Sequence, residues 1–225
     1  MGYDVSFHPI SPEEMREWYF TPLTWIQQGQ EEKVLALAAQ YGMEDFYAEK
    51  YLNTLRAGAE TEADELFDKS HGFYIAVIQG FFRDYYYTRG SAFSFLVEEK
   101  PEYRRYFTPW TQVAPPALPN PAENQIIENY SSGVYLSPEQ VTQLLKDMEQ
   151  DPKVLEDLEG RWSNGQLAVL KKALSAAAKS GVGLLEATEV VEPNPISPNE
   201  STSYSNLYHC DRDGVYPVSY THLTL

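Results

Sequence analysis

The segment from His71 to Val97 is the most apolar and most aromatic part of this chain, and it constrains the fold more than any other. Between Phe73 and Phe82 only Gln79 is strongly polar. A helix over these residues would be apolar on every side, and such a helix is buried. The run is much shorter than the ~20 residues that cross a bilayer, so we predict a core helix and no membrane span.

The end of this segment predicts where the helix stops. Arg83 and Asp84 interrupt the apolar run, and Gly90 can end a helix in the left-handed conformation that glycine tolerates. We therefore expect helical structure to reach about residue 90. Ser91 can cap a further helix.

The first half also contains a strand pattern and several helix patterns. Residues 3–7 alternate between apolar and polar side chains, which is typical of a strand. The string Ser-Pro-Glu-Glu at 11–14 then combines a capping serine, a first-turn proline and a capping-box glutamate. Strong helix formers fill residues 31–41 and 44–55. The chain is therefore expected to begin as a strand followed by a series of helices.

The second half repeats the capped-helix pattern and adds strands. A Ser-Pro-Glu-Gln string at 137–140 precedes apolar residues at helical spacing, and residues 166–180 also form a clear helix pattern. Residues 182–191 and 204–210 are expected to be strands. We predict an α+β fold that is predominantly helical with a small mixed β-sheet. If the halves form one domain, residues 3–7 should pair with a strand of the second half.

Prolines separate the two halves. Pro109, Pro115, Pro116 and Pro119 disfavour both a regular helix and a central strand. We predict a helix-rich lobe over 1–107, a proline-rich connection over 108–124 and an α+β lobe over 125–216. The two lobes could still form one domain.

The last residues carry a different signal. Residues 218–225 resemble the translated read-through of a sequencing adapter, and this resemblance implies no family. We expect 217–225 to be a non-native tail, with the natural protein departing from the printed sequence after about Tyr216.

The formal net charge of −16 restricts the possible partners. A field of this sign repels phosphate backbones and anionic membrane surfaces, so we expect neither nucleic-acid nor membrane binding. It attracts a basic protein. The simpler alternative is that the charge only keeps the protein soluble.

The single cysteine, Cys210, bears on the compartment. One cysteine cannot form an internal disulfide, and the N-terminal residues do not resemble a signal peptide. We therefore expect a reducing, cytoplasmic setting.

One group of candidate binding residues lies in the apolar segment. His71 stands at its start, and Arg83 and Asp84 stand at the end of its apolar run. Together they could form a polar site in an apolar cleft. The alternative is structural: a capping histidine, and an ion pair of Arg83 and Asp84 that terminates the buried run.

A second group is Glu186, Glu189 and Glu192, around the strand predicted for 182–191. Carboxylates in one cleft could bind a cation or act as general acid and base. However, Glu186 and Glu189 would face opposite sides of a regular strand, and Glu186 and Glu192 would lie far apart. A solvated edge is the favoured interpretation.

The string His-Cys-Asp-Arg-Asp-Gly at 209–214 contains several metal-ligating residue types but lacks a complete site. Structural zinc needs four ligands with paired spacing, and a calcium loop needs a distal glutamate in register. Adjacency of His209 and Cys210 does not make a nucleophile, because neighbours on a strand point apart. We predict no metal, no cofactor and no catalytic residue from motifs, and interpret this string as a turn with a buried cysteine.

Two function classes follow from these patterns. The first is a protein-binding module of the inhibitor or immunity type, which would engage a basic partner. The second is an enzyme, possibly a hydrolase, with scattered acidic residues and His71 in a cleft. A deep pocket with converging titratable groups would favour the enzyme, whereas a broad, flat acidic surface with tyrosines would favour binding.

Overall fold

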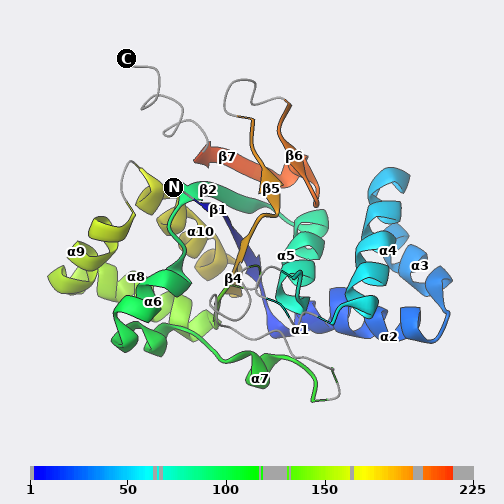
Figure 1. Cartoon of the computed structure of the whole chain (residues 1–225), viewed down its shortest axis with the longest axis horizontal. Helices are drawn as coiled ribbons and strands as arrows, with labels where there is room; N and C mark the ends of the chain where they lie inside the picture. The colour runs from blue at the N-terminus through cyan, green and yellow to red at the C-terminus, as the bar shows by residue number, and fades with distance from the viewer. Residues whose placement is uncertain are drawn as a thin grey trace.

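The computed structural model describes residues 3–62, 65, 68–116, 118, 131, 133–162, 165–194 and 200–214. The predicted fold class is confirmed, because helices predominate and enclose a small mixed sheet (Figure 1). The helices are α1 (Pro12–Met15), α2 (Thr21–Gln27), α3 (Glu31–Gln40), α4 (Asp45–Glu60), α5 (His71–Phe82), α6 (Phe93–Glu99), α7 (Trp110–Val113), α8 (Pro138–Gln150), α9 (Pro152–Arg161) and α10 (Gln166–Ser180). The strands are β1 (Tyr3–Ile10), β2 (Tyr85–Gly90), β3 (Tyr135–Leu136), β4 (Gly183–Thr188), β5 (Val191–Glu192), β6 (Thr202–Ser203) and β7 (Cys210–Gly214). A π-helical turn (Arg16–Phe20) joins α1 to α2, and 3-10 turns form at η2 (Pro101–Tyr106) and η4 (Leu207–His209).

The main sheet has the order β3-β4-β1-β2-β7. β1 lies at its centre and pairs antiparallel with β2 on one side and β4 on the other, so Val5 lies between Thr88 and Thr188. β7 adds in parallel to β2. The predicted pairing of residues 3–7 with a second-half strand is confirmed. The division into lobes at 1–107 and 125–216 stays a prediction, since part of the proline-rich connection lies outside the described residues.

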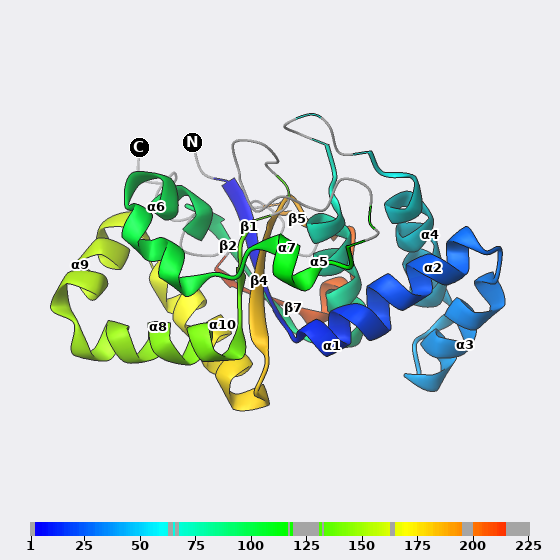
Figure 2. The same cartoon turned by 90° about the horizontal axis from the view of Figure 1, so that it is seen from below.

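Helices cover both faces of this sheet (Figures 1 and 2). Because side chains alternate along β1, Val5 and Phe7 enter one apolar cluster with α6, α8, α9 and α10, while Ile10 joins the cluster of α2 to α5. The sheet therefore separates two cores. Within the described ranges no helix is both long and apolar enough to cross a membrane.

Helix α5 is the predicted core helix, and most of its side chains are buried. It ends at Phe82, so the prediction that helical structure continues to about residue 90 is wrong. Arg83 already has extended backbone angles, and residues 85–90 form β2. The three consecutive tyrosines have strong strand preferences, and β1 and β7 provide backbone partners on both sides. Local propensity and sheet pairing together outweigh the helical pattern.

Two further boundaries differ from the sequence predictions. The last strand is β7 at 210–214 and not 204–210, because Asn206 caps the 3-10 turn η4 by accepting a hydrogen bond from the Tyr208 amide. The proline-rich connection also contains the short helix α7, in which Trp110 is buried. A proline at N-cap precedes this helix, a position where its missing amide hydrogen is not needed.

The capping box at the start of α8 is confirmed and gives a first prediction. The Gln140 amide donates to Ser137 Oγ at 3.3 Å, and the Ser137 amide donates to Gln140 Oε1 at 2.8 Å. Replacing Ser137 by alanine removes one of these bonds, so we expect the free energy of unfolding to fall by about 1 kcal/mol. Urea denaturation checks this. Ser175→Ala, at an exposed position within α10, is the matched control and should change stability by less than about 0.5 kcal/mol. Equal effects at the two serines would contradict the capping role.

Candidate functional site

Glu186 is the predicted site residue whose position differs most from expectation. Its side chain is buried beneath α6, so the prediction of a solvated edge is wrong for this residue. One carboxylate oxygen accepts from the Phe93 amide at 2.5 Å, and the other accepts from the amide and hydroxyl of Ser94. Burial raises the pKa of Glu186 to about 7. The residue links β4 to the start of α6 and cannot contact a partner protein.

Glu189 and Glu192 remain at the surface, as expected for an edge. Glu189 lies just after β4 with φ of 61°, so the alternation of a regular strand does not apply to it. Its carboxylate pairs with Lys69. Burial raises the pKa of Asp4, and the nearby charges of Glu189 and Glu192 raise it further. These three carboxylates form a small acidic cluster beside the N-terminal end of β1, without Glu186. Within it, Asp4 also pairs with Arg89 and Glu189 with Lys69.

His71 lies in the core and not in a cleft. It is buried at the start of α5, where its Nδ1 is 2.6 Å from the hydroxyl of Tyr19. The two rings meet edge to face. This removes the residue on which the enzyme alternative relied for its cleft. The role of His71 is structural, but it is not the capping histidine of the alternative, because Ser70 is the N-cap residue of α5 and makes no side-chain capping bond.

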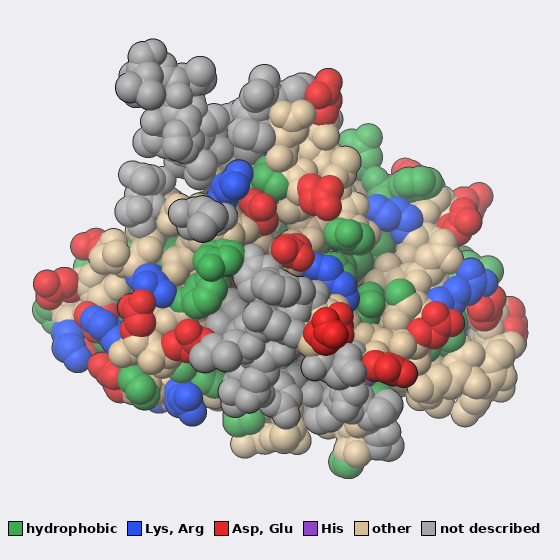
Figure 3. All heavy atoms as spheres, in the orientation of Figure 1, with side chains coloured by type: hydrophobic (Ala, Val, Ile, Leu, Met, Phe, Trp, Pro, Cys, Tyr) green, Lys and Arg blue, Asp and Glu red, His purple; other side chains and the backbone are tan. Residues whose placement is uncertain are grey.

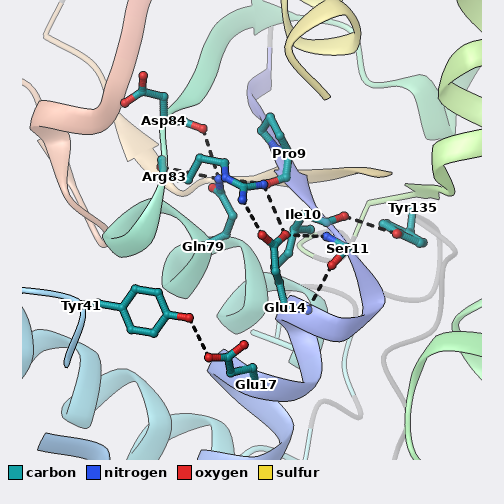
Figure 4. Close-up of polar contacts among 10 residues, drawn as sticks. All are labelled: Pro9, Ile10, Ser11, Glu14, Glu17, Tyr41, Gln79, Arg83, Asp84 and Tyr135. Carbon is teal, nitrogen blue, oxygen red and sulfur yellow. Dashed lines mark hydrogen bonds and ion pairs between the residues drawn. The ribbon is translucent and has the colours of Figure 1, made fainter. Parts of the chain in front are cut away.

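Arg83 and Asp84 do not form a site with His71, because α5 separates them. Figure 4 shows the Arg83 guanidinium directed at the carboxylate of Glu14, with which it forms a two-pronged ion pair. Gln79 donates to the backbone oxygens of Pro9 and Asp84 beside it. The Asp84 side chain itself is exposed. This network joins the end of α5 to the β1–α1 turn. An ion pair does end the buried run, but Arg83 forms it with Glu14 and not with Asp84.

An aromatic pocket that the sequence did not predict lies next to this network. Its volume is about 450 Å³, within the usual range of ligand sites. It lies between the α3–α4 loop, the first turn of α4, the end of α5 and the turn η4. We call it the aromatic pocket, and it is lined by Tyr41, Gly42, Met43, Glu44, Tyr47, Phe81, Phe82, Asn206, Tyr208 and His209.

The aromatic rings at the base of the pocket pack against one another and against the core. Phe82 meets Tyr41 edge to face at 5.0 Å between ring centroids, and it meets the buried Tyr51 at 5.4 Å in the same way. Tyr47 lies 6.3 Å from Phe81. By contrast, Tyr208 is 89% exposed on the rim. The pocket thus has a packed floor and a rim side chain that is available to a ligand.

The charge at the aromatic pocket is negative. Glu44 lines it, and no lysine or arginine is among its described lining residues. The Tyr41 hydroxyl donates to Glu17 at 2.6 Å (Figure 4), and this hydrogen bond raises the pKa of Tyr41. Glu44 is the N-cap residue of α4, yet its side chain makes no capping hydrogen bond. Glu44 is also exposed, so its side chain is accessible to a cation from solvent.

The potentially reactive residues at 209–214 are engaged in contacts that stabilise the fold. Cys210 is buried, and burial raises the pKa of its thiol to about 12, which disfavours a nucleophilic thiolate. His209 Nδ1 donates to the Gly80 carbonyl at 2.9 Å, which ties η4 to α5. Among the described residues, no group of three or more His, Cys, Asp and Glu side chains is arranged to hold a metal ion.

The surface charge is mixed on the face seen in Figure 3, where acidic and basic side chains are interspersed. This face is therefore not a broad, uniformly acidic surface. The aromatic pocket differs because its described lining combines a glutamate and several rings with no lysine or arginine. The sequence signal that could have found it is the recurrence of aromatic residues at 41, 46–47 and 81–82, but their convergence depends on how α4 packs on α5.

Comparison with protein-family models, with curated proteins and with solved structures found no match to this chain. A function is therefore inferred from the residues and their geometry alone.

Proposed function

We propose that this chain is a protein-binding module of the inhibitor or immunity type, whose partner is a basic protein in the cytoplasm. The observation that carries the proposal is the aromatic pocket, with Glu44 in its lining and Tyr208 exposed on its rim. Exposed tyrosines contribute strongly to protein interfaces, because a rigid ring buries a large area at a small entropy cost. A net charge of −16 selects for a partner of opposite sign.

Other exposed aromatic residues support a binding surface near this pocket. Phe46, in the first turn of α4, is 65% exposed, and Tyr41 is 45% exposed. Tyr41 and Tyr208 line the pocket together with Glu44, and the Phe46 ring lies 5.1 Å from the ring of the lining residue Tyr47. An interface of this kind has an aromatic centre and a charged rim.

Salt sensitivity is the expected signature of such a complex. The chain is immobilised, exposed to an extract of its host at low salt, and eluted with rising salt. We expect the captured protein to be basic, and its affinity to fall about tenfold or more between 50 and 500 mM salt, because the Debye length shrinks below 8 Å. Mass spectrometry identifies the protein, and surface plasmon resonance with the purified partner measures the dependence.

The acidic cluster provides a comparison within this experiment. Reversing Glu189 and Glu192 to lysine should weaken the salt-dependent part of binding if that cluster steers the partner, and reversing Glu62 and Glu65 is the matched change elsewhere. Glu186 is left intact because it is buried. An acidic partner, or an affinity that is flat across this salt range, would contradict the proposal.

A further inference from the structure

We propose that the aromatic pocket receives one arginine side chain of its partner. The existence of that partner rests on the proposed function, whereas the preference of the pocket for arginine is argued from its own residues. The pocket has aromatic walls, a carboxylate and no cation of its own among its described lining residues. A guanidinium group satisfies each of these features. The reasons concern the rings, the charge and the shape.

A guanidinium group of the chain itself lies on a ring that packs against the pocket, although that ring, Trp18, does not line it. Arg83 lies over the Trp18 ring, 5.7 Å from its centroid, and Trp18 stacks on Phe82 at 4.6 Å with nearly parallel planes. Phe82 in turn lines the aromatic pocket. Close by, Lys50 lies 5.8 Å from the centroid of the Phe46 ring. Both contacts are made by rings next to the pocket and not by its lining, and they show that aromatic rings of this region accept positive charge.

The charges around the pocket strengthen this preference. A tyrosine that donates its hydroxyl proton to a carboxylate has a more electron-rich ring, and Tyr41 donates to Glu17 in this way. Glu44 adds a carboxylate whose side chain is not used in capping α4. The carboxylate and the ring both lie in the lining of the same pocket. A cation there gains from both, whereas an anion would be repelled.

Arginine fits better than lysine for two reasons. The guanidinium group is planar, so it can stack on a ring face, and it is more weakly hydrated than an ammonium group, so it is easier to desolvate between rings. It can also give two parallel hydrogen bonds to one carboxylate, here that of Glu44. His209 adds a further acceptor, because its Nδ1 donates to Gly80 and its Nε2 carries a lone pair when the ring is neutral.

The rim residue Tyr208 is the side chain on which the test depends. It is 89% exposed, and the hydrogen bond from its amide to Asn206 fixes the turn that carries it. Replacing it by serine alters no packed contact of the core. Loss of ligand binding in this variant would therefore be due to a change in the pocket and not to unfolding of the protein.

The direct test uses three capped tripeptides with the full chain. Acetyl-Gly-Arg-Gly-amide, the same peptide with lysine, and the same peptide with citrulline are titrated and followed by NMR shifts and by calorimetry. We expect the arginine peptide to bind in the millimolar range, the lysine peptide about threefold to tenfold more weakly, and the neutral citrulline peptide without measurable affinity. Equal binding of lysine would overturn the assignment to arginine, and equal binding of citrulline would overturn recognition of charge.

Variants of the chain then test whether the arginine peptide binds in the aromatic pocket. Tyr208→Ser and Glu44→Gln should each weaken the arginine peptide about fivefold or more, whereas Tyr204→Ser, an exposed tyrosine outside the lining of this pocket, should leave it unchanged. If these two pocket variants capture the basic partner as well as the original chain does, the proposed function stands and the pocket assignment is wrong. If no basic partner is captured but the arginine peptide still binds the pocket, the assignment stands and the proposed function is wrong.

Discussion

Replacing Ile78 by alanine is expected to lower the free energy of unfolding by about 2–5 kcal/mol, the range found for large apolar residues in protein cores. Ile78 lies in the middle of α5 and is fully buried. Its neighbours Val77 and Gln79 are also buried, so the helix cannot turn to fill the space. Chemical denaturation with guanidinium, with fluorescence and circular dichroism as probes, measures the change.

Alanine substitutions at two other positions on α5 provide a comparison for the loss of stability at Ile78. The sequence predicts comparable losses at Tyr74 and Phe82, but the structure shows both side chains only partly buried. Because these rings are partly exposed, the loss for each atom removed should be smaller at Tyr74 and Phe82 than at Ile78. A midpoint close to that of the unaltered chain for Ile78→Ala would mean that α5 is not the centre of the core.

The elements that the sequence predicted well are those with local signals. The Ser-Pro-Glu-Glu and Ser-Pro-Glu-Gln strings each gave a capped helix, because the capping residues and the helix start lie within four residues of one another. The alternation at residues 3–7 likewise depends on neighbours in the chain. These features need no knowledge of the rest of the fold.

The elements that the sequence did not predict depend on distant parts of the chain. Residues 85–90 became β2 because β1 and β7 lie on either side of them, and β7 follows more than a hundred residues later. The aromatic pocket has the same origin, since Tyr41, Phe82 and Tyr208 converge only after α4 packs on α5 and η4 closes over both. Periodicity within a segment carries no information about such convergence.

Glu186 illustrates the limit for a single residue. When a glutamate occurs in a strand that is otherwise apolar, its side chain is expected to lie on the face of the strand that is open to water. Here α6 covers that face and supplies donors from Phe93 and Ser94, so the carboxylate is buried and hydrogen-bonded. Gly133 packs against the Glu186 carbonyl with φ of 57°, so a larger residue at this position would clash with the strand.

The buried carboxyl of Glu186 is expected to make stability depend on pH. Its pKa is raised by burial to about 7 in the folded chain, against 4.5 for an ordinary glutamate. The folded state therefore holds more protons than the unfolded state between these two values, and stability from this group falls as pH rises from about 5 to about 8. The contribution is of the order of 3 kcal/mol, since one unit of pKa corresponds to about 1.4 kcal/mol.

A buried histidine opposes this trend and determines how the experiment is designed. His8 lies between Gln79 and Ser6, and burial lowers its pKa to about 3. The unfolded state therefore gains protons at this residue as pH falls through 6.5, which destabilises the fold in acid. The pH profile of the unaltered chain is a sum of both effects. The difference between that chain and a Glu186→Gln variant isolates the glutamate, because His8 contributes equally to both.

We expect Glu186→Gln to be more stable than the unaltered chain at pH 8, by about 1–3 kcal/mol, and similar to it at pH 5. Glu186→Ala is the contrasting variant. It leaves the donors of Phe93 and Ser94 without their acceptor and opens a cavity, so at pH 5 it should be less stable than the unaltered chain by about 3 kcal/mol or more. At pH 8 this deficit should be smaller, because the unaltered chain has itself lost the contribution of Glu186. Urea denaturation across this range measures all three proteins. Parallel pH profiles for Glu186→Gln and the unaltered chain would show that Glu186 does not titrate in the folded state within this window.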